Sequence, residues 1–253
     1  MRRRSDSEKI VLGRWDRDDL DRVLASASAI SGTGRRIEFL SRQFLGVPYR
    51  ESTLIGTEHE PEKLTIDLDA MDCFTYLDYV EAMRRSVDFA DFKETLKIVR
   101  YRGGKVDYTA RNHFFTDWIA SNPFVRDMTA HVGQEKTRRV RKKLNDRGDG
   151  TYFVSGIPPA NRVVTYIPGR AIDAGTVRRL RNGDYIGIYS RARGLDVSHV
   201  GIVIRARGKT LLRHASSSSA HRIVTEEDFL AYAASKPGIV VLRPGLRALA
   251  LSR

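Results

Sequence analysis

The chain has 253 residues, of which 41% are hydrophobic, which is enough for one large domain or two small ones with a substantial core. Its 44 Lys and Arg outnumber 31 Asp and Glu, and the resulting formal charge of +13 favours polyanionic partners. No run of about 18 apolar residues occurs, so the sequence excludes a transmembrane helix.

The N-terminus carries three arginines, Arg2 to Arg4, as the charged region of a secretory signal does. The acidic residues Asp6 and Glu8 then stand where such a signal needs an apolar stretch. The sequence as given therefore predicts no export signal. We expect a periplasmic or envelope location if a leader is missing, and a cytoplasmic one otherwise.

The first half of the chain shows helical periodicity. Between residues 34 and 45, Ile37, Leu40 and Phe44 lie on one helical face, and Gly46 then provides a stop signal. Patterns of this kind predict helices at 16–30, 34–45, 72–83, 91–101 and 114–120. A short apolar segment at 64–68 leads into the third of them.

From about Arg162 onward, β-branched residues dominate between Gly, Pro and Asn. We predict strands at 163–167, 184–189, 197–205, 211–215 and 239–242, and one helix at 226–234. Helices first and strands afterwards predict an α+β fold in which N-terminal helices pack on a C-terminal antiparallel sheet. We expect an extension with a helix at 1–33, a single domain at 34–245 whose β part begins at about 161, and a tail at 246–253.

The densest basic stretch lies between Lys136 and Arg147 and contains Arg138, Arg139, Arg141, Lys142 and Lys143. Such a stretch suits nucleic acid, anionic lipid or anionic wall polymers. It has no interleaved aromatic residues and matches no groove-reading motif. We therefore interpret it as a solvated face or loop and predict no specific nucleic-acid partner.

Cys73 is the only cysteine, so no internal disulfide can form. A lone cysteine is usually a small buried hydrophobe. Here it follows Asp72, a residue type that caps helices, and Val80 and Met83 continue its face of the predicted helix. Backbone N–H groups at a helix N-terminus stabilise both a thiolate and the oxyanion that forms when it attacks a carbonyl. Cys73 is therefore a candidate nucleophile.

His199, in the predicted strand 197–205, is the candidate base for this thiol. Val200 and Ile202 share one face of the strand, whereas His199 shares the other with Gly201, which has no side chain. The imidazole then projects where a substrate can approach. The alternative is a histidine with a purely structural role.

His214 lies on the next predicted strand. The residues from Arg205 to Gly208 favour a hairpin turn. A regular register centred between residues 206 and 207 places His199 and His214 directly opposite each other, with Cβ atoms about 5 Å apart. One ring can then orient the other, unless a bulge at Gly208 weakens the pairing.

Several motifs, in this order, resemble those of NlpC-type papain-like cysteine peptidases. The motifs are Gly46 to Tyr49, Asp72-Cys73-Phe74-Thr75, Asn182 to Ile186, Ser198-His199-Val200-Gly201-Ile202 and His214-Ala215-Ser216. With residues 111–119 and 194–201, the sequence more closely resembles the N-acetylmuramoyl-L-alanine amidase-like branch of that superfamily, over about residues 37–232.

The resemblance implies a papain-like NlpC-type fold with an antiparallel sheet or a partly closed barrel. It implies that Cys73 is the nucleophile, His199 the base and His214 the polar residue behind it, with no metal and no cofactor. The implied reaction hydrolyses the amide between N-acetylmuramic acid and L-alanine in muropeptide fragments with a 1,6-anhydro sugar, in cell-wall turnover or recycling. The parent family implies the alternative of a γ-D-glutamyl-diaminopimelate peptidase.

The same resemblance gives five candidate substrate-binding residues, namely Tyr49, Asp72, Arg111, His113 and Ser198. Tyr49 lies at the edge of the cleft or is an ordinary half-buried aromatic residue. Asp72 binds substrate or only caps its helix. Arg111 and His113 are expected to hold polar groups of the sugar or the peptide.

Two further functions stay open on the residues alone. A zinc hydrolase would recruit Cys73, His113, His199 and His214 as ligands, although neither an H-E-x-x-H run nor a C-x-x-C pair is present. A non-enzymatic module that binds polyanions would explain the net charge without any chemistry.

Overall fold

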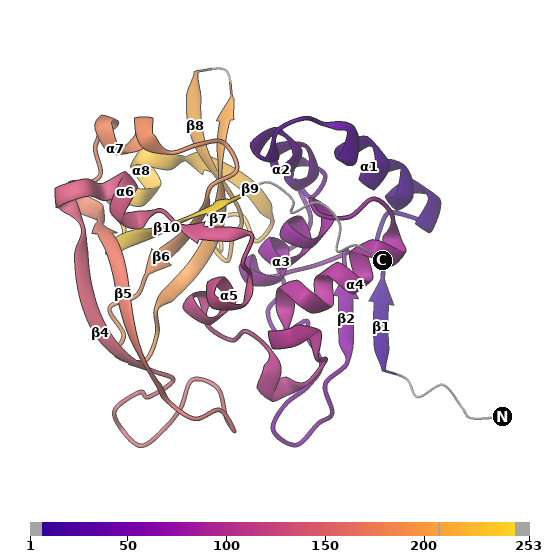
Figure 1. Cartoon of the computed structure of the whole chain (residues 1–253), viewed down its shortest axis with the longest axis horizontal. Coiled ribbons are helices and arrows are strands. Elements are labelled where there is room, and N and C mark those ends of the chain that lie inside the picture. Colours follow the sequence, from indigo (N-terminus) through magenta and orange to yellow (C-terminus); the bar gives the residue numbers. More distant parts are fainter. Residues whose placement is uncertain (1–6, 207, 246–253) are drawn as a thin grey trace.

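The computed structural model describes residues 7–206 and 208–245, so the predicted tail and the arginines near the N-terminus lie outside the described residues. Figure 1 shows a helical half, formed by the first part of the chain, beside a half built around a large sheet. The helices are α1 (Arg17–Ala29), α2 (Thr33–Arg42), α3 (Cys73–Met83), α4 (Phe89–Arg100), α5 (Phe115–Ser121), α6 (Thr129–Gly133), α7 (Ala174–Arg179) and α8 (Phe229–Ala234).

Most strands belong to a single eight-stranded sheet with the order β4-β5-β10-β6-β7-β8-β9, and β3 pairs with β10. All of these pairs are antiparallel, whereas β1 and β2 form a small parallel pair in the helical half. The strands are β1 (Glu8–Val11), β2 (Leu64–Asp67), β3 (Val125–Asp127), β4 (Arg138–Leu144), β5 (Ala160–Pro168), β6 (Tyr185–Tyr189), β7 (Val197–Ala206), β8 (Lys209–Ala215), β9 (Val224–Asp228) and β10 (Gly238–Pro244). The α+β prediction with a large antiparallel sheet is confirmed.

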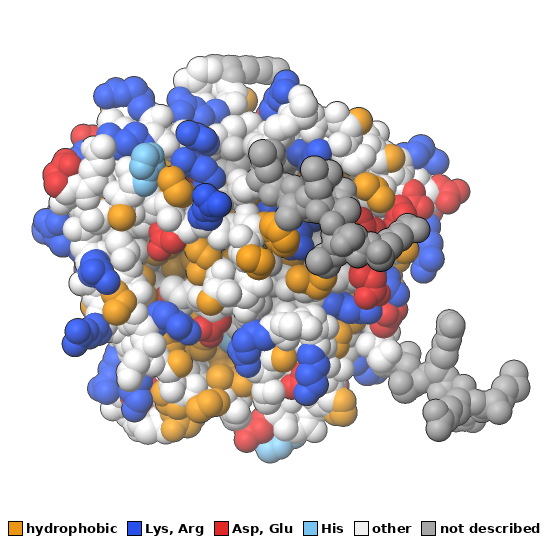
Figure 2. Space-filling model, viewed as in Figure 1, with side chains coloured by type: hydrophobic (Ala, Val, Ile, Leu, Met, Phe, Trp, Pro, Cys, Tyr) orange, Lys and Arg blue, Asp and Glu red, His pale blue; other side chains and the backbone are white. Residues whose placement is uncertain are grey.

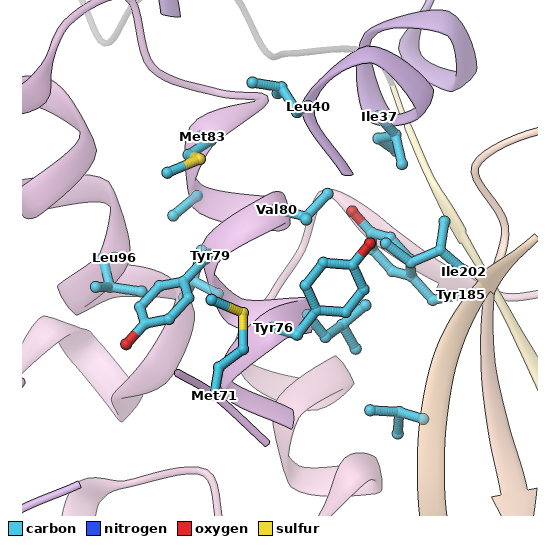
Figure 3. Close-up of a cluster of buried hydrophobic side chains, with 14 of the residues drawn as sticks. Ile37, Leu40, Met71, Tyr76, Tyr79, Val80, Met83, Leu96, Tyr185 and Ile202 are labelled. Atoms are coloured by element: carbon cyan, nitrogen blue, oxygen red, sulfur yellow. The ribbon is translucent and has the colours of Figure 1, made fainter. Parts of the chain in front are cut away.

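Both faces of the sheet are covered. Helix α3 lies in the larger core, where Tyr76 and Val80 pack toward Tyr185 of β6 and Ile202 of β7 (Figure 3). A second, smaller core on the other face joins β6, β7 and β8 to α6 and α8, and Phe229 lies within it. Burial on both faces explains why the sequences of these strands are apolar runs and not regular alternations of apolar and polar residues.

A buried ion pair fastens α3 to its neighbours. Asp78 of α3 and Arg100 of α4 are each 2% exposed, and Arg100 Nε donates to the Asp78 carboxylate at 2.8 Å. Trp118 of α5 donates its indole N–H to the other Asp78 oxygen at 2.9 Å. Arg100 also donates to the Thr65 carbonyl of β2 at 2.6 Å. One carboxylate therefore holds together several elements of the helical half.

The predicted helix at 226–234 begins three residues later than expected. Residues 224–228 form β9, which pairs with β8, and the Asp228 side chain then caps α8 by accepting from the Ala231 N–H at 2.9 Å. The acidic residues at the start of the expected helix are therefore strand residues. Pairing with β8 outweighs the high helix propensity of Glu226 and Glu227.

The basic stretch forms strand β4 rather than a loop. Arg139, Arg141 and Lys143 are exposed, in keeping with a solvated face, but Lys142 points inward and is 7% exposed. Its ammonium donates to the carbonyl oxygens of residues 190, 192 and 195 at 2.5 to 2.8 Å. The charge of Lys142 thus serves the fold, while other Lys and Arg side chains are scattered over the surface shown in Figure 2.

None of the helices in residues 7–206 and 208–245 has the length and apolar character that crossing a bilayer requires.

Candidate active site

Cys73 is the first residue of helix α3, and the Asp72 carboxylate caps that helix. One carboxylate oxygen accepts from the N–H groups of Phe74 and Thr75 at 3.0 and 2.7 Å. The Thr75 hydroxyl bonds back to the Asp72 N–H at 3.0 Å, which completes a capping box. This cap fixes where the helix begins and so places the thiol at its N-terminus.

The Cys73 thiol lies against the start of strand β7, where the backbone N–H of Val200 can bond to it. That N–H and those of Cys73 and Phe74 lower the pKa of the thiol, as expected for a helix N-terminus. Burial and the Asp72 carboxylate act in the opposite direction and dominate, which raises the pKa to about 12. The backbone N–H groups therefore do not outweigh burial, and Cys73 is a neutral thiol at pH 7.

The two histidines lie next to each other, although not in the predicted register. Ala206 pairs with Lys209 and Ile202 with Arg213, a shift of two residues from the expected pairing. His214 consequently faces Gly201, since a Cβ added at Gly201 would lie 3.1 Å from that of His214. His199 is the diagonal neighbour of His214, and the missing side chain between them leaves room for their rings.

Contact between the two rings is direct. Nε2 of His199 and Nδ1 of His214 are 2.6 Å apart, and the ring planes are nearly perpendicular at 88°. Burial, together with the neighbouring His214 and Lys236, lowers the pKa of His199 to about 3. Burial also lowers the pKa of His214, so both imidazoles are neutral at pH 7.

The sequence analysis missed Glu227, which lies behind His214. Its Oε1 is 2.8 Å from Nε2 of His214, and the Glu227 side chain is 34% exposed whereas that of His214 is 2% exposed. A helix predicted at 226–234 gave no reason to place this carboxylate beside a strand residue. The pairing of β9 with β8 does so, because His214 faces Thr225 and Glu227 shares the same face two residues away.

Tyr232 of α8 is a second residue that the sequence did not reveal. Its ring centroid is 5.2 Å from that of His214. Burial, Glu227 and the nearby Cys73 raise the pKa of its phenol. Tyr232 therefore lies close to both the thiol and the histidine pair.

A hollow of about 660 Å³ opens beside the two histidines. Ser198 lines it and is exposed, at a point where the pairing of β6 with β7 shifts register. The other lining residues include His199, His214, Glu227 and Tyr232. A small polar substrate group can enter here and reach the imidazoles.

Tyr49 also lies close to the thiol. It pairs with Met71, two residues before Cys73, and burial followed by the charges of Cys73 and Asp72 raises the pKa of its hydroxyl to about 12. Arg222 lies over its ring at 5.3 Å. The Tyr49 hydroxyl is therefore a neutral donor beside the candidate nucleophile.

The structure does not bring Arg111 and His113 into the hollow. Arg111 forms an ion pair with Glu62 and lies over the ring of Tyr108. Nε2 of His113 lies 2.8 Å from the Tyr108 carbonyl oxygen, and burial lowers the pKa of His113 to about 4. Both side chains hold the loop around Tyr108.

Within the described residues, no three His, Cys, Asp or Glu side chains are grouped to hold a metal, so the suggested zinc ligands are not assembled.

Comparison with known protein families assigns the chain to one of them. Residues 39–239 match the family model described as AmiA-like, N-acetylmuramoyl-L-alanine amidase-like. The chain belongs to this N-acetylmuramoyl-L-alanine amidase-like family. The match spans the thiol, both histidines and Glu227. No curated protein matches the chain.

The chain is also similar to several solved structures, one of which carries the amidase name. An N-acetylmuramoyl-L-alanine amidase from Bacteroides uniformis is 28% identical, with a TM-score of 0.72 over 85% of this chain and 99% of that one. A Bacteroides fragilis protein named as a xylanase is also 28% identical, with a TM-score of 0.65 over 80% and 98%. A Legionella pneumophila protein shares the fold at 21% identity, with a TM-score of 0.77 over 91% and 94%.

Proposed function

We propose that this amidase-like chain is a papain-like cysteine amidase of the NlpC type. It cleaves the amide between the lactyl group of N-acetylmuramic acid and L-alanine, in soluble muropeptides with a 1,6-anhydro sugar. The observation that carries the proposal is that the backbone N–H of Val200 bonds to the Cys73 thiol, while the adjacent His199 on the same strand contacts His214 at 2.6 Å. This order of groups provides a nucleophile, a base and a group that orients the base.

In the proposed reaction, His199 removes the thiol proton as the sulfur bonds to the amide carbon. The resulting oxyanion is stabilised by the Cys73 N–H, which the Asp72 cap leaves free, and by the Tyr49 hydroxyl. Collapse of the tetrahedral intermediate breaks the C–N bond, and His199 returns the proton to the leaving L-alanine nitrogen. Water, deprotonated by His199, then attacks the thioester carbon, the C–S bond breaks, and His199 returns the proton to the Cys73 sulfur. The muramic acid is released as its carboxylic acid, which ionises in water.

Mass spectrometry of a muropeptide digest tests the bond that is cleaved. We expect a peptide that begins with L-alanine, together with the peptide-free sugar that carries the lactyl carboxylate. Cleavage between D-glutamate and diaminopimelate would instead identify a peptidase and contradict the amidase proposal. Xylan is a control substrate, because the Bacteroides fragilis structure is named as a xylanase, and we expect no hydrolysis of it. Glycoside hydrolysis needs a pair of carboxyl groups flanking the bond, whereas Glu227 is engaged with His214.

The resting state of the site predicts an unusual pH profile. His199 acts as a base in its neutral form, and its pKa of about 3 keeps it neutral far below the ordinary value of 6.5. Cys73, with a pKa of about 12, stays protonated far above neutral pH. We expect kcat/KM to be nearly constant from about pH 5 to pH 9, whereas ordinary pKa values would give a bell-shaped profile.

The acidic end of this profile needs a control for unfolding. An unfolded histidine takes up a proton near pH 6.5, but folded His199 does not until about pH 3. The unfolded state thus binds more protons between these values, so His199 lowers the free energy of unfolding as the pH falls through that range. Circular dichroism at each pH separates this loss from catalysis. A bell-shaped profile of kcat/KM with apparent pKa values near 6.5 and 8.5 in folded protein would contradict a resting site with neutral His199 and neutral Cys73.

A further inference from the structure

We propose that Glu227 is a positioning residue that fixes the tautomers of His214 and His199, and so selects Nδ1 of His199 as the base. The inference rests on the proposed function only for what this base does. For the tautomers themselves it rests on two contacts, namely that of Glu227 with His214 and that of His214 with His199.

The direction of both hydrogen bonds follows from the chemistry of the groups. An ionised carboxylate only accepts, so Nε2 of His214 must carry its hydrogen toward Glu227 at 2.8 Å. Neutral His214 then has a bare Nδ1, which can only accept. The partner 2.6 Å away is Nε2 of His199, which must therefore donate. Neutral His199 is left with its lone pair on Nδ1, the nitrogen that is free to take the thiol proton.

The surroundings of His214 offer no alternative for this role. His199 faces it from β7 and Tyr232 from α8, while His221 and Lys236 lie near enough to lower its pKa. His221 and Lys236 carry like charge when protonated, and Tyr232 makes a ring contact. Among the described residues, Glu227 is the acidic group bonded to His214. Without it, both neutral tautomers of the histidine pair become accessible, and one of them places a hydrogen on Nδ1 of His199.

Strand β9 provides a matched pair of positions for the test. Glu227 faces His214, whereas Glu226, one residue earlier, points to the other face and bonds to Arg213 at 2.9 Å. The Glu227 side chain is 34% exposed, so an apolar replacement leaves no sealed cavity. Glu227→Leu therefore removes the acceptor, Glu227→Gln keeps an acceptor oxygen without the charge, and Glu226→Gln changes a carboxylate on the same strand that touches neither histidine.

Long-range ¹H–¹⁵N NMR of the histidine side chains reads the tautomers without any substrate. In the unmodified protein at pH 7, we expect His199 and His214 each to carry hydrogen on Nε2 alone. Glu227→Leu is expected to mix the tautomers of both rings and to slow alkylation of Cys73 by iodoacetamide at least about tenfold. Glu227→Gln is expected to fall between the two, and Glu226→Gln to retain both the tautomers and the alkylation rate.

Two results would overturn this role for Glu227. One is an unchanged tautomer pattern and alkylation rate in folded Glu227→Leu protein. The other is an equal loss in Glu226→Gln, which would indicate general loosening of β9. Failure of the proposed function looks different: the tautomers shift as expected in Glu227→Leu, yet the unmodified protein cleaves no wall amide.

Discussion

Replacing Cys73 with alanine is expected to lower kcat for amide hydrolysis by about 10⁴-fold or more, because the proposed acyl intermediate forms on the Cys73 sulfur. Cys73 is partly exposed at the first position of α3, and the Asp72 cap does not use its side chain. Alanine also has the highest helix propensity. We therefore expect the free energy of unfolding to change by less than about 1 kcal/mol, as measured by urea denaturation.

Chemical inhibition provides the companion test. Cys73 is the single cysteine of the chain, so iodoacetamide can label one thiol only, and loss of activity should follow its alkylation mole for mole. A chelator should leave the rate unchanged. Activity that survives in folded Cys73→Ala protein, or that a chelator removes, would contradict the cysteine mechanism and favour a metal hydrolase.

Local signals in the sequence were sufficient to place Cys73 at the start of a helix. Asp72 is a capping residue, and an apolar face follows it, so the start of α3 at Cys73 could be predicted from neighbouring residues. The protonation state of the thiol could not be predicted in this way. It depends on burial against β7, a strand far away in the chain, and that burial outweighs the favourable backbone N–H groups.

The histidine pair shows how far a hairpin register can be predicted. Recognising the hairpin was enough to bring His199 and His214 together, but its pairing differs by two residues from the centred one. Both registers keep the same side chains on the same face, because the period of a strand is two. The two histidines therefore meet in either register, as direct or as diagonal neighbours. The contact of Glu227 with His214 could be predicted only if residues 224–228 were assigned as a strand. The acidic residues of this segment did not favour that assignment.

The position of Cys73 depends in turn on how α3 is held, and the pair of Asp78 and Arg100 predicts the cost of loosening it. Arg100→Leu is expected to lower the free energy of unfolding by about 3–5 kcal/mol, because it leaves the Asp78 carboxylate buried without its cation. Trp118 still donates to Asp78 in that variant. The matched control is Lys97→Leu on the same helix, whose partner Glu94 is 66% exposed, and its expected cost is below about 1 kcal/mol.

The pH dependence of Arg100→Leu separates loss of the cation from loss of packing. Burial already raises the pKa of Asp78, and Arg100 opposes that rise. Without Arg100 the pKa of Asp78 rises further above its unfolded value, so the folded state binds more protons than the unfolded state over that range. The stability deficit of the variant should therefore shrink as the pH falls from 7 toward 5, measured by urea denaturation beside the unmodified protein. A deficit that stays constant with pH would show that the guanidinium acts through packing and its bond to the Thr65 carbonyl, and not by neutralising Asp78.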